Sequence, residues 1–389
     1  MRAVEIVTIK NKIPLYKKDE PALQIELIEL EEVGYELVAQ KHLYEVGDKA
    51  VLILPDYNVS DIPLFDSFIR PNGDESKSML GKVGGQARRI RAKKFNLSKE
   101  PNGLPVYSNG ILLPFNTVGY YLAEKKIAID IENLDKLLEI TKYEEPEIGS
   151  SSGLKTMGSM SFPQGLYKTD EENINNIWNS IKYLIRLIGT EKVDGSSITI
   201  GITPVIPEGF ICSRNLRKKL AVTKHVGRRN KSFLETIMFW KKPDLNIYQE
   251  VPSEDDFVLY GLPYLNKLKE SGITNLIFRG ELNGGKLKGS GNKNNPASKG
   301  QANIQFFGSD ALIDGVAVKD DYFNFDIQSR LLEFPKVKEV FNRQFDSKEE
   351  LLEICNEYFK NNMIEGIVVR THDSKFSAKI MNLEYDSKK

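Results

Sequence analysis

Thr190-Glu191-Lys192-Val193-Asp194-Gly195-Ser196-Ser197 lies between two segments with different periodicities. After it, SSITIGIT (196–203) has the alternation of a strand. Before it, Thr169 and Glu172 have the spacing of a capping box, and apolar residues recur at helical spacing until Gly189, which predicts a helix. The apolar residues are Ile174, Ile177, Trp178, Ile181, Leu184, Ile185 and Ile188. The K-x-D-G tetrapeptide alone is compatible with a surface turn, so its meaning depends on the rest of the chain.

Further short stretches of charged and aromatic residues follow in a definite order. Downstream of the tetrapeptide they are Ser213-Arg214-Asn215, Arg279-Gly280-Glu281-Leu282, IQFFGSDA (304–311), Glu365-Gly366-Ile367-Val368-Val369-Arg370 and Phe376-Ser377-Ala378-Lys379-Ile380-Met381-Asn382. Upstream are Phe162-Pro163 and Lys168-Thr169-Asp170-Glu171. Taken singly, Glu281 could be a solvent-facing strand end, Glu365 a salt-bridge partner and Lys379 a solvated edge lysine. Their joint order is much more specific than any one of them.

In order and approximate spacing, these stretches resemble the motifs of covalent nucleotidyltransferases. The K-x-D-G stretch resembles their nucleophile motif, and the later stretches resemble motifs Ia, III, IIIa, IV and V. The upstream F-P and K-T-D-E stretches look like those that precede the nucleophile in certain RNA ligases. The resemblance covers residues 160–385. The whole chain resembles the ATP-dependent RNA ligases of the RNA ligase 5 type, which carry an OB domain ahead of the catalytic domain.

The first 115 residues have the pattern of a small all-β unit. Short apolar runs are separated by Gly, Pro, Asn and Asp, and about five strands in this length fit an OB-like barrel. The runs are VEIVTI, LQIELIEL, KAVLILP, RRIRAKKF and SNGILLP. The basic stretch 82–99 has two interpretations, a charged strand edge that blocks pairing or a track for a phosphate backbone. Because this unit is remote in sequence from every motif, we expect it to bind nucleic acid and to take no part in the chemistry on ATP.

Length and composition predict a multidomain globular protein. The chain has 389 residues, and single hydrophobic cores stop growing near roughly 250 residues. We expect an all-β OB-like domain at 1–125, a connecting segment at 126–160, and an α+β, ATP-grasp-like nucleotidyltransferase domain with antiparallel sheets at 161–389. The connection contains EIGSSSGLKTMGSMS, which breaks every periodicity. Within the last domain, Ser347 and Glu350 predict a capped helix ahead of the strand EGIVVRT.

Charge and cysteine usage exclude several classes of protein. Lys plus Arg and Asp plus Glu both number 54, so net charge indicates no polyanionic partner. Two cysteines without C-x-x-C spacing and three scattered histidines exclude a disulfide scaffold and the usual zinc sites. No apolar stretch of about 18 residues and no signal-peptide core occur, so we expect a cytoplasmic or other reducing compartment and no membrane contact.

The resemblance implies a lysyl-AMP mechanism that uses ATP and Mg²⁺ or Mn²⁺. A lysine with a pKa near about 10.4 is almost wholly protonated at neutral pH, so a nucleophilic lysine requires nearby positive charge. By resemblance, Lys192 attacks the α-phosphate and Lys379 stabilises the charge that develops there. The metal is implied to lie near Asp194, Glu281 and Glu365, held through its waters because Mg²⁺ dehydrates reluctantly.

The remaining implied residues bind the nucleotide. Glu191 and Arg214 are nucleotide contacts by resemblance, Glu281 also faces the ribose, and Lys168 reaches the leaving pyrophosphate. The family's adenine-stacking aromatic is expected just before Asp310, where this chain has Ser309. Phe307 lies two residues earlier on the same strand face and could substitute. The alternative is that both Phe306 and Phe307 fill the core.

The implied partner is RNA, as a nicked duplex or an RNA–DNA hybrid, and the implied state is a monomer. Basic clusters follow motifs Ia and III and suit phosphate backbones, although a solvated loop is the alternative. DNA ligases and capping-type guanylyltransferases are the main alternatives, but they carry the OB domain after motif V, where seven residues follow Asn382 here. A non-catalytic nucleic-acid-binding relative is the third possibility, which the intact motif residues oppose.

Overall fold

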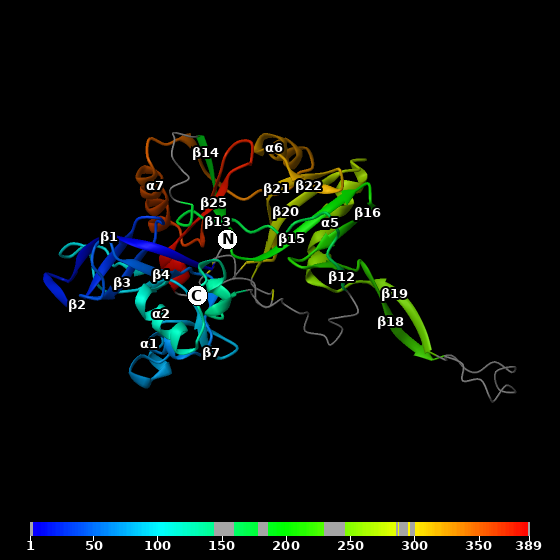
Figure 1. Cartoon of the computed structure of the whole chain (residues 1–389). Helices are drawn as coiled ribbons and strands as arrows, with labels where there is room; N and C mark the ends of the chain where they lie inside the picture. The colour runs from blue at the N-terminus through cyan, green and yellow to red at the C-terminus, as the bar shows by residue number, and fades with distance from the viewer. Residues whose placement is uncertain are drawn as a thin grey trace, which may run out of the picture.

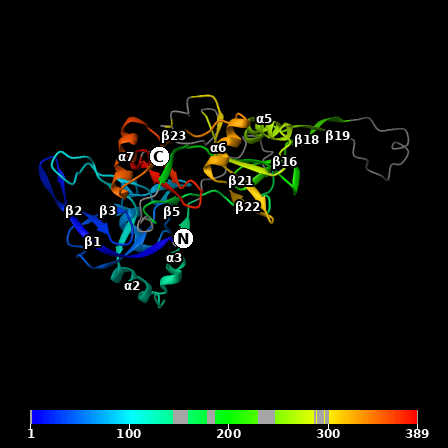
Figure 2. The same ribbon diagram turned by 90° about the horizontal axis from the view of Figure 1, so that it is seen from above.

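The computed structural model describes residues 3–143, 159–177, 186–228, 246–284, 287, 295 and 300–387. Most of EIGSSSGLKTMGSMS therefore lies outside the described residues. Figures 1 and 2 agree on the arrangement of the sheets: those of the N-terminal region (blue to cyan) lie beside a five-stranded sheet that contains β25 (red), and a seven-stranded sheet lies beyond it. In both views the hairpin of β18 (Ala221–Arg228) and β19 (Asn246–Pro252) points away from the rest.

The N-terminal region contains a five-stranded antiparallel sheet in the order β10-β4-β1-β2-β3. Its strands are β1 (Val4–Lys17), β2 (Glu20–Leu30), β3 (Glu36–Gln40), β4 (Lys49–Ile53) and β10 (Ile111–Pro114). Side chains of β4 alternate between two cores, since Val51 and Ile53 belong to one and Ala50 and Leu52 to the other. Four of the predicted strand runs coincide with β1, β2, β4 and β10, whereas β3 was not predicted.

The rest of the N-terminal region closes over one face of this sheet. Four short strands form a second sheet in the order β11 (Thr141–Lys142), β5 (Tyr57–Asn58), β7 (Gln86–Arg89) and β6 (Gly81–Val83), and β8 (Lys93–Lys94) pairs with β9 (Tyr107–Ser108). The region also contains α1 (Asp66–Ile69), α2 (Phe115–Glu124), α3 (Leu134–Leu137) and four 3₁₀ turns, at Pro63–Phe65, Pro71–Gly73, Glu75–Lys77 and Ile131–Asn133. The prediction of purely β structure is therefore wrong in detail. Both α1 and α2 lie within 1–125.

Two sheets organise the C-terminal region. The seven-stranded sheet has the order β12 (Ser159–Ser161), β17 (Leu216–Lys218), β16 (Ile206–Cys212), β15 (Ser196–Thr203), β20 (Leu276–Asn283), β21 (Asn303–Ile313) and β22 (Val316–Lys319). Helices α5 (Asp256–Glu270) and α6 (Tyr322–Leu331) share its apolar core. The five-stranded sheet has the order β13 (Glu172–Asn173), β25 (Ser377–Met381), β24 (Gly366–Arg370), β14 (Arg186–Lys192) and β23 (Glu339–Gln344).

The predicted antiparallel character of these sheets is confirmed, with one exception. Every described strand pair is antiparallel except β13 with β25. The predicted capped helix is also confirmed as α7 (Lys348–Asn361), where Ser347 Oγ accepts a hydrogen bond from the Glu350 N–H at 3.1 Å. Helix α7 packs on the five-stranded sheet, and a short helix α8 (Leu383–Ser387) follows β25. No helix in the described part of the chain is long and apolar enough to cross a membrane.

The predicted helix before Gly189 is wrong where the structure describes it. Glu172 lies in β13, residues 174–177 form a turn, and residues 186–188 belong to β14, while 178–185 lie outside the described residues. The physical reason is that β14 lies between β24 and β23 and is buried on both faces. Leu187 lies in the core under α7, and Ile188 lies in the core of the seven-stranded sheet. Because both faces of the strand are buried, its apolar residues do not alternate with polar ones, and their spacing can be mistaken for that of a helix.

The K-x-D-G stretch joins the two C-terminal sheets. Lys192 ends β14 and Ser196 begins β15, so Val193, Asp194 and Gly195 cross from one sheet to the other. A Cβ atom on Gly195 would lie 2.6 Å from the Leu282 carbonyl oxygen. Only glycine allows the two backbones to approach this closely, which explains the last residue of the tetrapeptide.

Candidate active site

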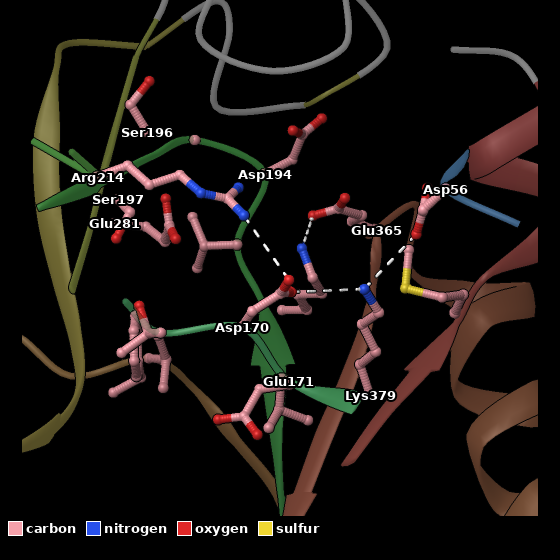
Figure 3. Close-up of a pocket in the computed structure, with 18 of the residues that line it drawn as sticks. Asp56, Asp170, Glu171, Asp194, Ser196, Ser197, Arg214, Glu281, Glu365 and Lys379 are labelled. Carbon is pink, nitrogen blue, oxygen red and sulfur yellow. Dashed lines mark hydrogen bonds and ion pairs between the residues drawn. The ribbon is translucent and has the colours of Figure 1, made fainter. Parts of the chain in front are cut away.

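A cavity of about 680 Å³ lies where the two C-terminal sheets and the N-terminal region meet. Its lining includes all but one of the residues implicated by the sequence: Glu191, Lys192, Asp194, Arg214, Glu281, Phe307, Glu365 and Lys379. The exception is Lys168, which is exposed and does not belong to the lining. Residues separated widely in the sequence therefore converge on one volume (Figure 3).

Lys192 is held at the end of β14 by its pairing with β24. Lys192 lies opposite Gly366 in this pair, which brings the preceding residue, Glu365, next to the lysine. The Lys192 Nζ donates a hydrogen bond to Glu365 Oε2 at 2.5 Å. The Glu365 side chain is only 9% exposed and that of Lys192 is 27% exposed, so the amine faces the cavity from a mostly buried ion pair. The predicted nucleophile and a predicted metal residue are thus in direct contact.

Lys379 lies between two carboxylates from different parts of the chain. Its Nζ is 3.6 Å from Asp56 Oδ2 and 3.9 Å from Asp170 Oδ1, as Figure 3 shows. Burial acts to raise the pKa of Asp56, but the charges of Lys379 and Arg89 outweigh it, so the pKa is lowered. Burial likewise acts to raise the pKa of Asp170, and the hydrogen bond from Lys142 with the charges of Lys379 and Arg214 lowers it overall. Both carboxylates are therefore ionised at neutral pH.

The two phenylalanines of IQFFGSDA have different environments. Phe306 is fully buried and packs against Phe278 and Phe334, whereas Phe307 lines the cavity. The backbone carbonyl of Phe307 accepts a hydrogen bond from the buried guanidinium of Arg370. Of the two phenylalanines, Phe307 is therefore the one placed to stack on a base in this cavity.

Ser309 and Asp310, which follow in the same strand, have structural roles. Ser309 is 2% exposed and hydrogen-bonds Asp320 and Gln328. Asp310 forms an ion pair with Arg279 at 2.6 Å, with both side chains at most 3% exposed, and it accepts a hydrogen bond from the Tyr167 hydroxyl at 2.8 Å. The position where the family aromatic is expected is therefore inside the protein.

The N-terminal unit is remote from the motif residues in sequence but lies beside them in space. Asp56 and Arg89 line the same cavity as Lys192, together with Lys142 from β11. Arg89 pairs with Asp56 at 2.9 Å and lies over the Tyr143 ring at 4.0 Å. Nothing in the local sequence around Asp56 signals this role, because an isolated aspartate after an apolar strand is common in loops.

The basic stretch of the N-terminal region is partly neutralised within the protein. Arg88 pairs with Asp61 at 3.3 Å and is 18% exposed, and Arg89 is 15% exposed. These two arginines belong to β7, which pairs with β5 and β6 on its two sides. The strand-edge interpretation is therefore wrong for these two arginines, whereas the phosphate track stays a prediction.

Three carboxylates that the sequence implicates in metal binding line the cavity. Within 3–143, 159–177, 186–228, 246–284 and 300–387, no cluster of three or more His, Cys, Asp or Glu side chains is arranged to hold a metal directly. Asp194, Glu281 and Glu365 nevertheless line the same cavity. Carboxylates spaced around a volume of this size can contact the waters of a hydrated Mg²⁺.

Comparison with solved structures reveals the same architecture in an RNA ligase of Naegleria gruberi. A mutant form with ATP and Mn matches with a TM-score of 0.67 and 18% identity over 100% of this chain and 99% of that chain. A mutant form with AMP and Mn matches with a TM-score of 0.67 and 19% identity over 100% and 98%. The chain has the fold of this RNA ligase. The ligase with PPi matches with a TM-score of 0.66 and 18% identity over 99% and 98%.

The RNA-ligase fold extends over the N-terminal sheets as well as the two sheets that carry the motifs, because the matches cover nearly the whole of both chains. This likeness confirms a multidomain architecture built on antiparallel sheets. No family model matches the sequence, and no curated protein matches it.

Proposed function

We propose that this protein is an ATP-dependent RNA ligase of the RNA ligase 5 type, which joins 3′-hydroxyl and 5′-phosphate ends through a lysyl-AMP intermediate. The observation that carries the proposal is the convergence of Lys192, Glu281, Glu365 and Lys379 on one cavity. The fold is supporting evidence, since the Naegleria gruberi RNA ligase with this fold has been solved with ATP, AMP and Mn.

In the first step, the Lys192 amine attacks the α-phosphorus of ATP, a P–N bond forms, and pyrophosphate leaves with the electrons of the broken P–O bond. In the second step, a 5′-phosphate of RNA attacks the same phosphorus and releases the lysine. In the third step, a 3′-hydroxyl attacks the adenylylated end, a phosphodiester forms and AMP leaves. Glu365 orients the amine for the first step, and Lys379 stabilises negative charge on the phosphates.

The other cavity residues bind and orient the nucleotide. Phe307 stacks on the adenine, Glu281 faces the ribose, and Arg214 and Glu191 complete the nucleotide contacts. Arg214 lies 3.7 Å from Asp170, and the Glu191 carboxylate accepts a hydrogen bond from Tyr358 at 2.6 Å. Lys168 contacts the leaving pyrophosphate, and it does so from a position outside the cavity lining. A hydrated Mg²⁺ or Mn²⁺ near Asp194, Glu281 and Glu365 supplies positive charge to the α-phosphate when it is bound.

The proposed enzyme has two domains and acts on RNA. Residues 1–125 form an OB-like domain, 126–160 connect it and begin with segments that pack into its core, and 161–389 form the adenylyltransferase domain. The shared core of the two N-terminal sheets supports a separate folding unit at the N-terminus. The substrate is a nicked RNA duplex or an RNA–DNA hybrid in RNA repair, and the enzyme acts as a monomer in a reducing compartment.

The test is covalent labelling of the purified protein. Incubation with α-labelled ATP and magnesium should transfer one adenylyl group to the peptide that contains Lys192, as mass spectrometry would show. Lys192→Ala and Lys192→Arg should form no adduct, because alanine has no nucleophile and a guanidinium stays protonated. An adduct on a different lysine would contradict the assignment.

The alternatives differ in nucleotide and substrate. Labelling by GTP in preference to ATP would indicate a guanylyltransferase. Sealing of nicked DNA, with no sealing of RNA or hybrid nicks, would indicate a DNA ligase. A protein that binds RNA but forms no lysyl adduct with either nucleotide would be a non-catalytic relative.

A further inference from the structure

The short C-terminal helix α8 brings a tyrosine hydroxyl to the K-x-D-G segment. The Tyr385 hydroxyl donates a hydrogen bond to Asp194 Oδ2 at 2.6 Å. Tyr385 is 1% exposed and Asp194 is 6% exposed, so this bond lies out of solvent. Burial and the hydrogen bond to Asp194 raise the pKa of Tyr385 far above its usual range. The hydroxyl thus donates to the carboxylate two residues after Lys192.

Helix α8 is fixed to the motif strands by the residue that precedes it. The Asn382 N–H donates to the Glu365 carbonyl at 2.9 Å, and Asn382 Nδ2 donates to the Ile364 carbonyl at 3.0 Å. Asn382 Oδ1 accepts hydrogen bonds from the N–H groups of Glu384 at 3.2 Å and Tyr385 at 3.4 Å. The start of the helix is thus tied to the segment that carries Glu365, so Tyr385 approaches Asp194 from a defined direction.

The residue before Tyr385 contacts the N-terminal region. The helix packs against β8, and Glu384 lies 3.7 Å from Lys94 of that strand. The helix therefore lies between the N-terminal region and the K-x-D-G segment. A side chain on a helix that is held in place by two neighbours can fix the rotamer of its partner more firmly than a side chain on a mobile tail.

We propose that Tyr385 is a positioning residue for formation of lysyl-AMP. Its hydroxyl holds the Asp194 carboxylate, and through it the segment that presents Lys192. Without the hydroxyl, a buried carboxylate loses a charge-assisted hydrogen bond and turns toward other donors. This inference rests on the proposed function, and it assigns a role to a residue outside all the motifs.

The test compares two tyrosine-to-phenylalanine variants. Tyr385→Phe removes only the hydroxyl and keeps the buried ring. Tyr322→Phe is a matched control, because Tyr322 is also buried and its hydroxyl donates to Glu339 at 3.0 Å, yet Glu339, unlike Asp194, does not line the cavity. Single-turnover formation of lysyl-AMP should be about tenfold slower at saturating ATP and magnesium in Tyr385→Phe, the effect of one lost hydrogen bond to a charged group. The control should stay within about twofold of wild type.

The apparent KM for ATP should change little in Tyr385→Phe, because the hydroxyl contacts the carboxylate and not the nucleotide. A merely structural role would instead lower the thermal midpoint of both variants without separating their rates.

A double-mutant cycle makes the test specific to Asp194. If the tyrosine acts through this carboxylate, Tyr385→Phe should slow adenylylation no further in an Asp194→Ala background. Residual lysyl-AMP in that background can be measured at high enzyme concentration. Full additivity, or a wild-type rate in Tyr385→Phe alone, would overturn the inference. Absence of lysyl-AMP in the wild-type protein would instead overturn the proposed function.

Discussion

Neutralising Asp56 tests whether the N-terminal region takes part in the chemistry on ATP. Asp56 comes from the loop after β4, and its carboxylate lies 3.6 Å from Lys379 and 2.9 Å from Arg89. Asp56→Asn keeps the shape of the side chain and removes its charge. Among the carboxylates in the described part of the chain, Lys379 then keeps its ion pair with Asp170, at 3.9 Å. We expect its ammonium group to shift toward Asp170 and away from the N-terminal wall of the cavity.

The size of the effect follows from the distances and the exposure. At an effective dielectric constant of about 20, unit charges 3.6 Å apart attract by about 4 to 5 kcal/mol. The Asp56 side chain is 36% exposed, and solvent reduces such an attraction to about 1 kcal/mol. If this energy positions Lys379 in the transition state, formation of lysyl-AMP should slow about fivefold.

The assay is single-turnover lysyl-AMP formation with labelled ATP, followed by sealing of a pre-adenylylated nick in a separate experiment. The matched control is Asp61→Asn, which removes an N-terminal carboxylate that pairs with Arg70 at 2.5 Å and Arg88 at 3.3 Å but does not line the cavity. The control should adenylylate as the wild type does. If Asp56→Asn also forms lysyl-AMP at the wild-type rate and loses only sealing, the N-terminal region is a substrate clamp, as its sequence alone suggested.

Two further predictions address the metal and the core. Glu365→Ala and Asp194→Ala should reduce lysyl-AMP formation far more than they lower the thermal midpoint, since each removes a carboxylate near the metal. A wild-type rate for either variant across a magnesium titration would exclude that role. Asp310→Ala leaves the Arg279 guanidinium buried beside an apolar side chain, and it should lower the free energy of unfolding by about 3 to 5 kcal/mol. Urea denaturation measures this, and a loss below about 1 kcal/mol would show that water or Tyr167 compensates.

The motif residues could be identified from sequence because their spacing is set by local geometry. Lys192 ends a strand, and the glycine three positions later is required because a Cβ atom there would lie 2.6 Å from the Leu282 carbonyl oxygen. Glu365 precedes the glycine that pairs with Lys192, so strand register alone brings the two side chains together. Such constraints act over a few residues, so they produce short sequence motifs that can be recognised without the structure.

Other features depend on contacts that no short pattern records. Asp56 lines the cavity, and Tyr385 contacts Asp194, only because the N-terminal region and α8 pack beside the motif strands. The predicted helix before Gly189 failed for a related reason. An apolar run buried on both faces has no alternation, so its period does not distinguish strand from helix, and only the neighbours of β14 decide.

The arrangement of charges around the nucleophile explains why these distant segments are needed. Lys192 and Lys379 bring two cations to one cavity, and each is paired with carboxylates: Lys192 with the mostly buried Glu365, and Lys379 with the partly exposed Asp56 and Asp170. Two like charges in a partly buried volume repel each other unless each has a compensating partner at short range. The partner of Lys192 comes from the next strand, whereas one partner of Lys379 must come from the N-terminal region. That region therefore contributes to the electrostatics of the cavity before any RNA is bound.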